Sequence, residues 1–515
     1  MKINLSGKPG NLSLNRALDI LSNNIGIEEL TEEEQKSIQQ EEGNPVIVLD
    51  ANADYEITET LVIEIPVCIK GNGARILNRA KIGFQITASN VVMENLTISE
   101  GMISVIIDAL GRDISNICFN SCQFDRYILA GVKVGSTKNN SICRAVKFQN
   151  CNFRAQLSKN DKGEMFVCAC DLILTAANSS SEDVCDAVLD GVTVEHCEVL
   201  GPSICNFMIV PGLSIDSSYT PVFDRCGIRN IKIADSKLMG SDDTAVAAQA
   251  NYINNYNCYF ENLEVINNIC EFGLTGISAS AGSPMKGDCD GIYIRNIHIL
   301  NNVLTGKPDV GETRTAIGAG GGGINYYSCS CYNSWVQNME IRGNKISDCE
   351  RGITLTGGSS MIDADASSEL KGNYVEDVII EDNILKNVEN CFIFYGAWIE
   401  GRRFDWNWGK HHTTQTWLPH VIDNSRTTMM ASDNYIRKLR CVNNRCDGFS
   451  YLLRAAGAVG RGHGVMGNNR MTDDIIFRNN TFKNGENHIY VADCALEDWV
   501  QDMGGNTVNK SLKNI

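Results

Sequence analysis

The sequence predicts an all-β solenoid, a stack of similar coils built from short strands and tight turns. Alternating strands are repeatedly followed by one small or polar turn residue and then by an apolar residue two positions later. Successive turn residues lie about 20 to 60 residues apart, the spacing of repeat architectures that carry loop insertions. They are Cys122, Cys151, Cys197, Ser236, Asn268, Asn302, Asn344, Asn383, Asn444 and Asn480. One coil alone exposes its strand edges, whereas stacked coils pair their backbones and bury a continuous core.

The later members of this turn column are all Asn. Asn tolerates the left-handed backbone of a tight turn, and stacked amides can bond to the coils above and below. Cys and Ser are small substitutes at a buried turn. We therefore predict that this column forms one ladder inside the solenoid.

Length and charge limit the classes of partner. A periodic solenoid can absorb all 515 residues in one domain. The net charge of −17 disfavours a nucleic acid or an anionic membrane as partner, and no window reaches transmembrane length. A sugar is not excluded. An anionic polymer would need a local basic site.

The 21 cysteines are an odd number, so at least one is unpaired, and many fall on inward positions. Free thiols used as core residues predict a reducing, cytoplasmic location. The pairs Cys168/Cys170 and Cys329/Cys331 lack a second ligand pair at zinc-finger spacing. We therefore assign no metal and no cofactor.

The chain divides into three predicted parts. Residues 1–45 form an N-terminal helical cap, with apolar residues at helical spacing over 11–21 and an acidic helical run over 28–42. Residues 46–495 form the solenoid, with a loop insertion at about 396–435. Residues 496–515 form a C-terminal tail or cap.

Residues 55–73 contain a strand, a turn, a second strand and a glycine corner. This stretch resembles the first coils of the right-handed parallel β-helix superfamily, which includes pectate lyases and polygalacturonases, and the resemblance continues to about residue 493. It implies a right-handed parallel β-helix. The superfamily contains lyases, hydrolases, transferases, epimerases and phage adhesins, so the fold leaves the activity open.

Two adjacent carboxylates, Asp242 and Asp243, follow Gly240-Ser241 where a turn leads into a strand. This segment resembles the double-aspartate motif of polygalacturonase-type glycosidases, although Leu274-Thr275 stands where those enzymes have His. The resemblance implies that Asp242 or Asp243 is the general acid. The other aspartate and Asp171 would then activate water.

Other acids occupy the corresponding position of later coils, namely Glu350 beside Arg351, Glu389 beside Asn390, and Glu486 beside Asn487. Neighbouring coils lie about 4.8 Å apart, so such acids can face one cleft. Glycoside hydrolysis requires a pair of carboxyl groups. The alternative is that Asp, Glu and Asn are common turn residues.

A second group of β-helix enzymes, the inulin fructotransferase and difructose-dianhydride hydrolase type, is commonly trimeric and uses an acid pair from one coil and its loop. Asp171 with Glu182 in the following insertion is similar to such a pair. This resemblance implies a homotrimer that acts on an oligosaccharide, which suits a cytoplasmic protein.

The large insertion holds four of the six Trp residues. Aromatic faces stack on sugar rings, and Arg and His donate to hydroxyls or carboxylates. We predict that the insertion contacts the substrate, together with Arg351. The candidate contacts are Trp398, Glu400, Arg402, Trp406, Trp408, His411 and His412. The alternative is a loop that packs on the solenoid or on another subunit.

We conclude that the sequence predicts a carbohydrate-active enzyme, most simply a glycoside hydrolase or a glycosyl (fructosyl) transferase acting on oligosaccharides. A polysaccharide lyase, with Arg351 near the proton that is removed, is a further alternative. A non-enzymatic structural protein or adhesin is the alternative from another class. The glycine run at 318–323 predicts a close backbone approach or a mobile corner.

Overall fold

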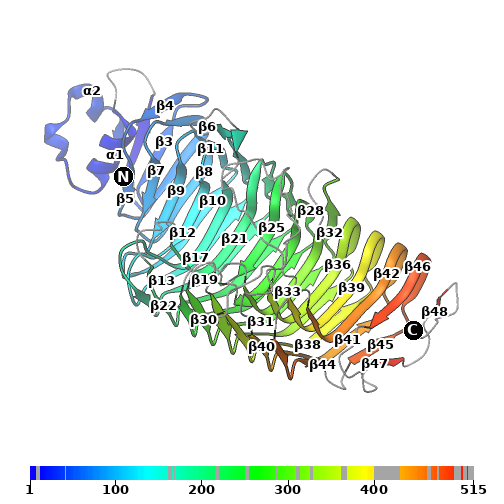
Figure 1. Ribbon diagram of the computed structural model, residues 1–515. Coiled ribbons are helices and arrows are strands. Elements are labelled where there is room, and N and C mark those ends of the chain that lie inside the picture. The colour runs from blue at the N-terminus through cyan, green and yellow to red at the C-terminus, as the bar shows by residue number, and fades with distance from the viewer. Residues whose placement is uncertain are drawn as a thin grey trace.

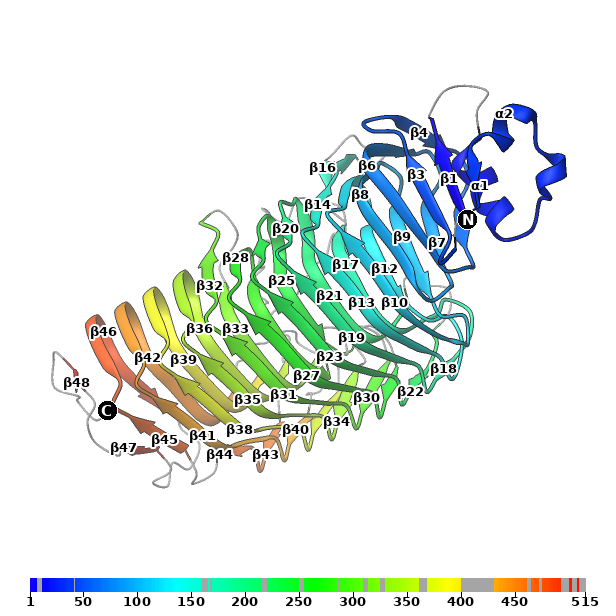
Figure 2. The same ribbon diagram turned by 180° about the vertical axis from the view of Figure 1, so that it is seen from behind.

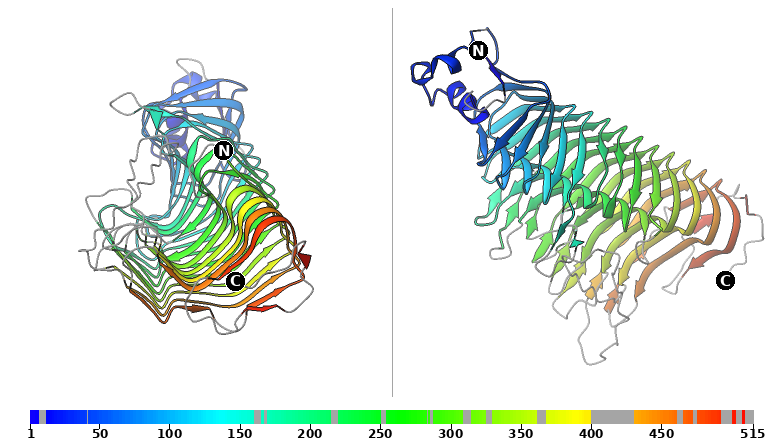
Figure 3. Two further views of the ribbon diagram at one scale, coloured as in Figure 1. Left: turned by 45° about the vertical axis from the view of Figure 1, so that its right-hand side comes forward. Right: turned by 90° about the horizontal axis from the view of Figure 1, so that it is seen from above.

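The computed structural model confirms the predicted right-handed parallel β-helix, a long stack of coils with short helices at its N-terminal end (Figure 1). Viewed along the stack, successive coils superpose (Figure 3). Among the described residues no helix is both long and apolar enough to cross a membrane. The structure describes residues 1–6, 12–40, 42–159, 165–166, 169–214, 220–249, 254–282, 284, 287–308, 314–324, 329–360, 368–399, 430–471 without 461–464, 475–491, 500–502 and 507–508.

Each coil begins with a strand of the long wall, whose neighbours pair in parallel register from rung to rung. These strands are β1 (Lys2–Leu5), β3 (Val46–Leu49), β10 (Asp113–Asn120), β13 (Ile142–Gln149), β19 (Val188–Glu195), β23 (Gly227–Ala234), β27 (Tyr259–Ile266), β31 (Tyr293–Leu300), β35 (Trp335–Arg342), β38 (Tyr374–Glu381), β41 (Tyr435–Val442), β44 (Arg470–Met471), β45 (Ile475–Arg478) and β47 (Val500–Asp502).

A short corner strand follows the turn column. The corner strands are β4 (Asp54–Ile57), β11 (Gln123–Tyr127), β14 (Asn152–Ala155), β20 (Glu198–Val199), β24 (Lys237–Leu238), β28 (Ile269–Phe272), β32 (Val303–Gly306) and β48 (Thr507–Val508). In two early coils the long wall and the corner merge into one strand each, β6 (Val67–Asn78) and β8 (Val91–Ser99).

The third side of each coil is the groove wall, whose strands lie side by side in Figure 2. Its strands are β5 (Leu61–Ile63), β7 (Ile82–Ile86), β9 (Ile103–Asp108), β12 (Ala130–Gly135), β17 (Cys170–Asn178), β21 (Ser203–Leu213), β25 (Ser241–Gln249), β29 (Thr275–Gly282) and β33 (Thr315–Ile324). In the last coils the corner and the groove wall form single strands, β36 (Lys345–Ser360), β39 (Ile384–Ile399), β42 (Arg445–Gly460) and β46 (Thr481–Val491).

A narrow wall of very short strands closes each coil from β18 onward. Its strands are β18 (Val184–Cys185), β22 (Phe223–Asp224), β26 (Asn255–Tyr256), β30 (Asp288–Asp290), β34 (Ser330–Tyr332), β37 (Glu369–Lys371), β40 (Met430–Ser432) and β43 (Val465–Gly467). A separate antiparallel hairpin, β15 (Ser158–Lys159) with β16 (Met165–Phe166), projects from one coil.

The N-terminal cap differs in part from the prediction. Helix α1 (Leu14–Leu21) buries its apolar face as expected, and Ser13 caps its N-terminus. The run over 28–42 is mostly not helical, because only η1 (Ile27–Glu29) and α2 (Glu32–Gln35) form before β2 (Ile38–Gln39) pairs with β1. Strand β1 also pairs with β3, so the solenoid begins inside the predicted cap.

The predicted Asn ladder is confirmed. Each buried Asn side chain donates to the Asn on the next coil, with Nδ2–Oδ1 distances of 3.1 Å from Asn268 to Asn302 and 3.0 Å from Asn302 to Asn344. The same bond joins Asn344 to Asn383, Asn383 to Asn444 and Asn444 to Asn480. The left-handed backbone belongs to the preceding residue, for example Asn267 with φ 58°, and not to the ladder Asn itself.

A second ladder lies between the narrow wall and the long wall, and it was not predicted. Its Asn members are joined by bonds of 3.0 Å from Asn373 to Asn434 and 2.9 Å from Asn434 to Asn469. Earlier coils place Cys226, Cys258 and Ser334 in this column. Both ladders therefore change from thiols to amides along the stack.

Stacked aromatic rings line the outside of the long wall. Neighbouring centroids are 4.7 to 5.8 Å apart, and the rings are nearly parallel. The rings belong to Tyr259, Tyr293, Trp335, Tyr374 and Tyr435. Their faces contact one another, so this stack stabilises the coil-to-coil register.

Asn344→Ala tests the ladder. The substitution removes the buried acceptor of the Asn302 backbone N–H and one of the two acceptors of the Asn302 side-chain amide. It also removes the side-chain donor to the carbonyl of Ile299. We expect the free energy of unfolding to fall by about 2–4 kcal/mol, measured by chemical denaturation. Asn152→Ala, on the outside of β14, is the matched control and should change stability by less than about 1 kcal/mol. Equal effects of the two substitutions would contradict the role assigned to the ladder.

Candidate functional site

The outer face of the groove wall changes character along the stack. Register places Cys170, Cys205 and Thr244 at one outward position of successive coils, followed by Thr275, Thr315, Arg351 and Asn390. The early coils are apolar on this face, with Ile173 and Met208 buried there. The later coils present hydroxyls and then charged and amide groups. The polar half of this wall is therefore the candidate site.

A hollow of about 120 Å³ lies on this polar half. Its described lining consists of Thr275, Ser278, Ser280, Thr315, Gly318, Ala319, Gly320, Arg351, Thr354, Thr356, Ser359, Ser360 and Trp398. Arg351 is buried, and its guanidinium lies 4.5 Å from the centre of the Trp398 ring. We call this hollow the hydroxyl groove.

Trp398 was predicted to lie in the large loop insertion, and this placement is wrong. It belongs to β39, where it pairs with Ser359 of β36. The cation–π contact with Arg351 nevertheless brings together two residues that the sequence assigned to substrate binding. Their role in binding stays a prediction.

A larger hollow of about 690 Å³ adjoins the hydroxyl groove at the start of the same strands. Pro308, Arg314, Asp348, Cys349, Glu350, Asn387 and Glu389 line it. Because Arg351 pairs with Asn390, Glu350 and Glu389 occupy equivalent positions on neighbouring coils. Their backbones are about 4.8 Å apart. We call this hollow the carboxylate cleft. It brings together two acids of the predicted column.

Asp242 and Asp243 begin β25 on an earlier coil. The Nζ of Lys307 lies 3.3 Å from Oδ1 of Asp242, and both side chains are mostly buried. Thr244 pairs with Thr275, so Asp243, and not Asp242, is the residue aligned with Leu274. The pairing of β21 with β25 also shifts register, between Ser203 and Cys205. Asp243 is three coils from Glu350, about 14 Å. The double aspartate therefore does not share the carboxylate cleft.

Asp171 is fully buried beneath the groove wall. Tyr127 donates its hydroxyl proton to one carboxylate oxygen, and Nδ2 of Asn206 donates to the other at 3.1 Å. Burial raises the pKa of Asp171 to about 6, although hydrogen bonds from Ser203, Tyr127 and Asn206 oppose the shift. This environment holds the carboxyl away from solvent. The structure does not bring Asp171 to the groove surface, where it would have to activate water.

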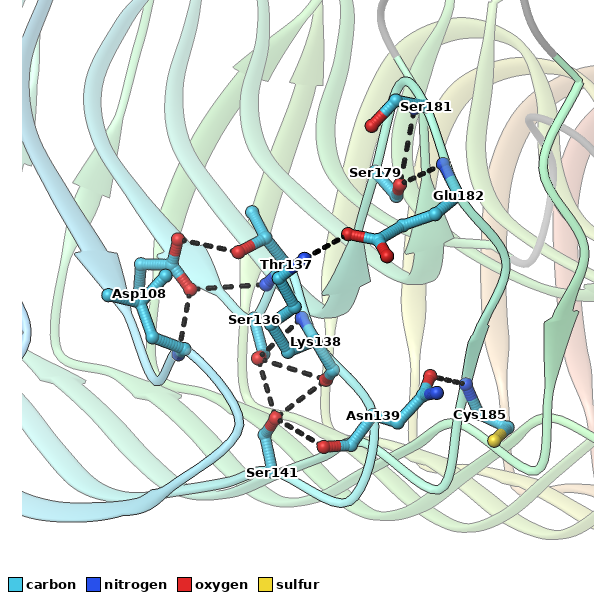
Figure 4. Close-up of polar contacts among 11 residues, drawn as sticks. Asp108, Ser136, Thr137, Lys138, Asn139, Ser141, Ser179, Ser181, Glu182 and Cys185 are labelled. Carbon is cyan, nitrogen blue, oxygen red and sulfur yellow. Dashed lines mark hydrogen bonds and ion pairs between the residues drawn. The ribbon is translucent and has the colours of Figure 1, made fainter.

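Glu182 lies in a turn beyond the far end of β17 (Figure 4). Its carboxylate pairs with Lys138, and its backbone N–H donates to the Ser179 hydroxyl at 3.0 Å. Both side chains of the ion pair are about half exposed. Asp171 stands near the start of β17, so the strand separates the two acids by about 20 Å. The structure therefore does not bring the predicted Asp171–Glu182 pair together, since two carboxyl groups that act on one glycosidic bond lie roughly 5–10 Å apart.

Six predicted substrate contacts lie outside the described residues, so the structure does not place them. They are Glu400, Arg402, Trp406, Trp408, His411 and His412.

Lys307 and Arg314 are charged residues at the site that were not singled out from the sequence. Lys307 and Arg314 flank a short insertion, and the guanidinium of Arg314 donates to the carbonyl of Lys307 at 2.6 Å. Because of that insertion, the sequence does not show that Arg314 and Glu350 occupy equivalent positions on neighbouring coils. The hydrogen bond from the Arg351 backbone N–H to the Arg314 carbonyl establishes this alignment. Glu389 was part of the predicted acid column, and only its alignment with Glu350 marked it as a site residue. Among the described residues no group of three or more His, Cys, Asp or Glu side chains could hold a metal ion.

Comparisons with known proteins agree with the fold and go no further. No family model matches the chain, and no curated protein matches it. Among solved structures it is similar to the catalytic domain of a GH87 alpha-1,3-glucanase in complex with nigerose, at 10% identity and a TM-score of 0.30, over 98% of this chain and 69% of that chain. It is also similar to a mannuronic acid specific polysaccharide family 6 lyase from human gut microbiota, at 10% identity and a TM-score of 0.32, over 99% and 91%. A third is PfbA, a surface adhesin of Streptococcus pneumoniae, at 11% identity and a TM-score of 0.25, over 87% and 90%. Likenesses this distant carry no argument about activity.

The buried Asp171 carboxyl predicts a pH dependence of stability. It keeps its proton to about pH 6 in the folded state, whereas the unfolded carboxyl ionises near pH 3.8. The resulting stabilisation is complete below about pH 4 and is lost as the pH rises to about 6. Over this range the wild type should lose about 3 kcal/mol more of its free energy of unfolding than Asp171→Asn, which cannot titrate. Denaturant titrations at several pH values measure the difference. Identical pH profiles would contradict the buried, protonated carboxyl.

Proposed function

We propose that the protein is a carbohydrate-active enzyme that cleaves a glycosidic bond of a saccharide bound across the carboxylate cleft and the hydroxyl groove. The observation that supports this function is the pairing of Glu350 with Glu389 on neighbouring coils, both lining one cleft of about 690 Å³. Glycoside hydrolysis uses a pair of carboxyl groups on one cleft, of which one protonates the leaving oxygen.

The two acids have different surroundings. Arg351 places its Nε 3.6 Å from Glu350, whereas Glu389 is exposed. A neighbouring cation favours the ionised carboxylate. We assign Glu350 as the carboxylate that attacks or activates water and Glu389 as the proton donor.

The hydroxyl groove continues from the cleft along the same strands and supplies the binding surface. Ser and Thr hydroxyls both donate to and accept from sugar hydroxyls, and Trp398 adds an aromatic ring to the lining. An oligosaccharide is therefore the substrate class that we propose. The cytoplasmic location and the homotrimer stay predictions.

A lyase is the second candidate, because basic groups stand at the same corner. Lys307 and Arg314 lie on the coil that precedes Glu350, between it and the double aspartate. Proton removal next to a sugar carboxyl group needs a base, and a cation nearby stabilises the resulting charge. The two reactions differ in their products. Hydrolysis gives a saturated new end, and elimination gives an unsaturated end that absorbs ultraviolet light.

Glu350→Gln and Glu389→Gln test the proposed pair. On an oligosaccharide that the wild type converts, identified from a panel by product analysis, we expect each variant to lose about 100-fold or more in kcat. Glu56→Gln, an exposed acid on β4 in the first coils, is the matched control and should retain wild-type turnover. All three variants should unfold at wild-type temperatures.

Asp242→Asn separates the proposal from the double-aspartate prediction. If Asp242→Asn abolishes turnover while both Gln variants keep it, the carboxylate pair is wrong and the double aspartate carries the reaction. If no saccharide of the panel is converted or bound, the proposed function fails as a whole.

A further inference from the structure

The glycine run at 318–323 serves two purposes, and only one of them is packing. Gly321 and Gly322 face the interior, where an added Cβ would lie 2.4 Å from the Tyr374 backbone nitrogen and 2.6 Å from the Asn373 side chain. The predicted close backbone approach is therefore confirmed at these two positions. Gly318 differs, because a Cβ there would meet no atom nearer than 3.8 Å.

Gly318 and Gly320 open a notch in the outer face of the groove wall. Gly318 pairs with Ser278 on one side and Thr354 on the other, and Gly320 pairs in the same way with Ser280 and Thr356. The missing side chains leave four hydroxyl-bearing residues around a floor of bare backbone. We call these six residues the glycine notch. All six line the hydroxyl groove.

The hydroxyl of Thr354 is the independent sign of a ligand. Thr354 is 7% exposed, and its Oγ1 has no hydrogen-bond partner among the residues that the structure describes. A buried hydroxyl without a partner destabilises the fold by about 1–3 kcal/mol, so such groups are rare unless they have a function. A group that entered the notch would accept or donate the missing bond.

Charge decides what kind of group fits. Among the described residues that line the hydroxyl groove, Arg351 alone is charged, and the Trp398 ring holds its guanidinium in place. Hydroxyl donors with one guanidinium suit an anionic oxygen group. This local positive charge is notable because the whole chain carries −17.

We propose that the glycine notch binds an acidic substituent of the saccharide, a carboxylate or a sulfate ester, with Arg351 as the specificity-determining residue. This inference rests on the proposed function, because it assigns a substrate class to the same groove. The hydroxyls of Thr354 and Ser280 complete the binding of the anionic oxygens, and Gly318 leaves the room for them.

Binding of three matched probes tests the inference. Glucose, glucuronate and glucose 6-sulfate share one ring and differ in charge, and their dissociation constants are measured by NMR titration at constant ionic strength. We expect the wild type to bind at least one acidic probe about tenfold more tightly than glucose. The acidic probe that binds more tightly shows whether the notch binds a carboxylate or a sulfate ester.

Two variants locate the binding. Gly318→Val fills the notch without backbone strain, since its φ is not in the left-handed region, and should weaken the acidic probe about tenfold or more. Arg351→Gln should remove the preference for acid over glucose. Gly467→Val on the narrow wall, where a Cβ has no neighbour closer than 3.9 Å, is the matched control and should bind like the wild type.

The inference is overturned if the wild type binds no acidic probe more tightly than glucose, or if Gly318→Val binds as the wild type does. In either case turnover by the wild type and its loss in Glu350→Gln still support the proposed function. If the wild type turns over no saccharide but still binds an acidic probe in the notch, the proposed function is overturned and the proposed binding site stands.

Discussion

The hydrogen bonds between stacked Asn side chains fix the register on which the other features depend. Each amide in the column from Asn268 to Asn444 is buried and bonds both to the next side chain and to a backbone carbonyl, as Asn302 does to Asn344 and Val265. A slip of one residue would break these bonds along the whole stack and turn inward side chains outward. The second ladder and the external aromatic stack hold the same register from other sides of the coil.

A fixed register turns sequence positions that are far apart into neighbours on a surface. Glu350 and Glu389 are separated by one full coil along the chain, yet they stand on adjacent rungs. The same rule lines up Ser278, Gly318 and Thr354 across three strands. The inward positions of these three strands hold buried apolar residues such as Ile277, Ile317 and Ile353. The outward positions carry no packing constraint, so they are free to change from an apolar patch to a polar groove along one wall.

The sequence was sufficient for the fold because the ladder recurs with a visible period. The second ladder was missed because Cys226, Ser334 and Asn373 follow strands of only two or three residues, which leave no alternating pattern. Errors in the predicted register explain why the candidate site was only partly predicted. A shift between Ser203 and Cys205 moved the double aspartate by one residue, and the insertion before Arg314 hid that residue's place in the acid column. The burial of Asp171 depends on Tyr127 and Asn206, which belong to neighbouring coils, and no local pattern predicts that contact.

The central claim is that one glycosidic bond lies between Glu350 and Glu389 while the saccharide extends over the hydroxyl groove. A crystal structure of the Glu350→Gln protein soaked with a converted oligosaccharide tests it most directly. The account predicts a sugar bridging the two rungs, with the scissile oxygen within hydrogen-bond distance of the Glu389 carboxyl group. A saccharide bound beside Asp242, or on another wall of the solenoid, would contradict it.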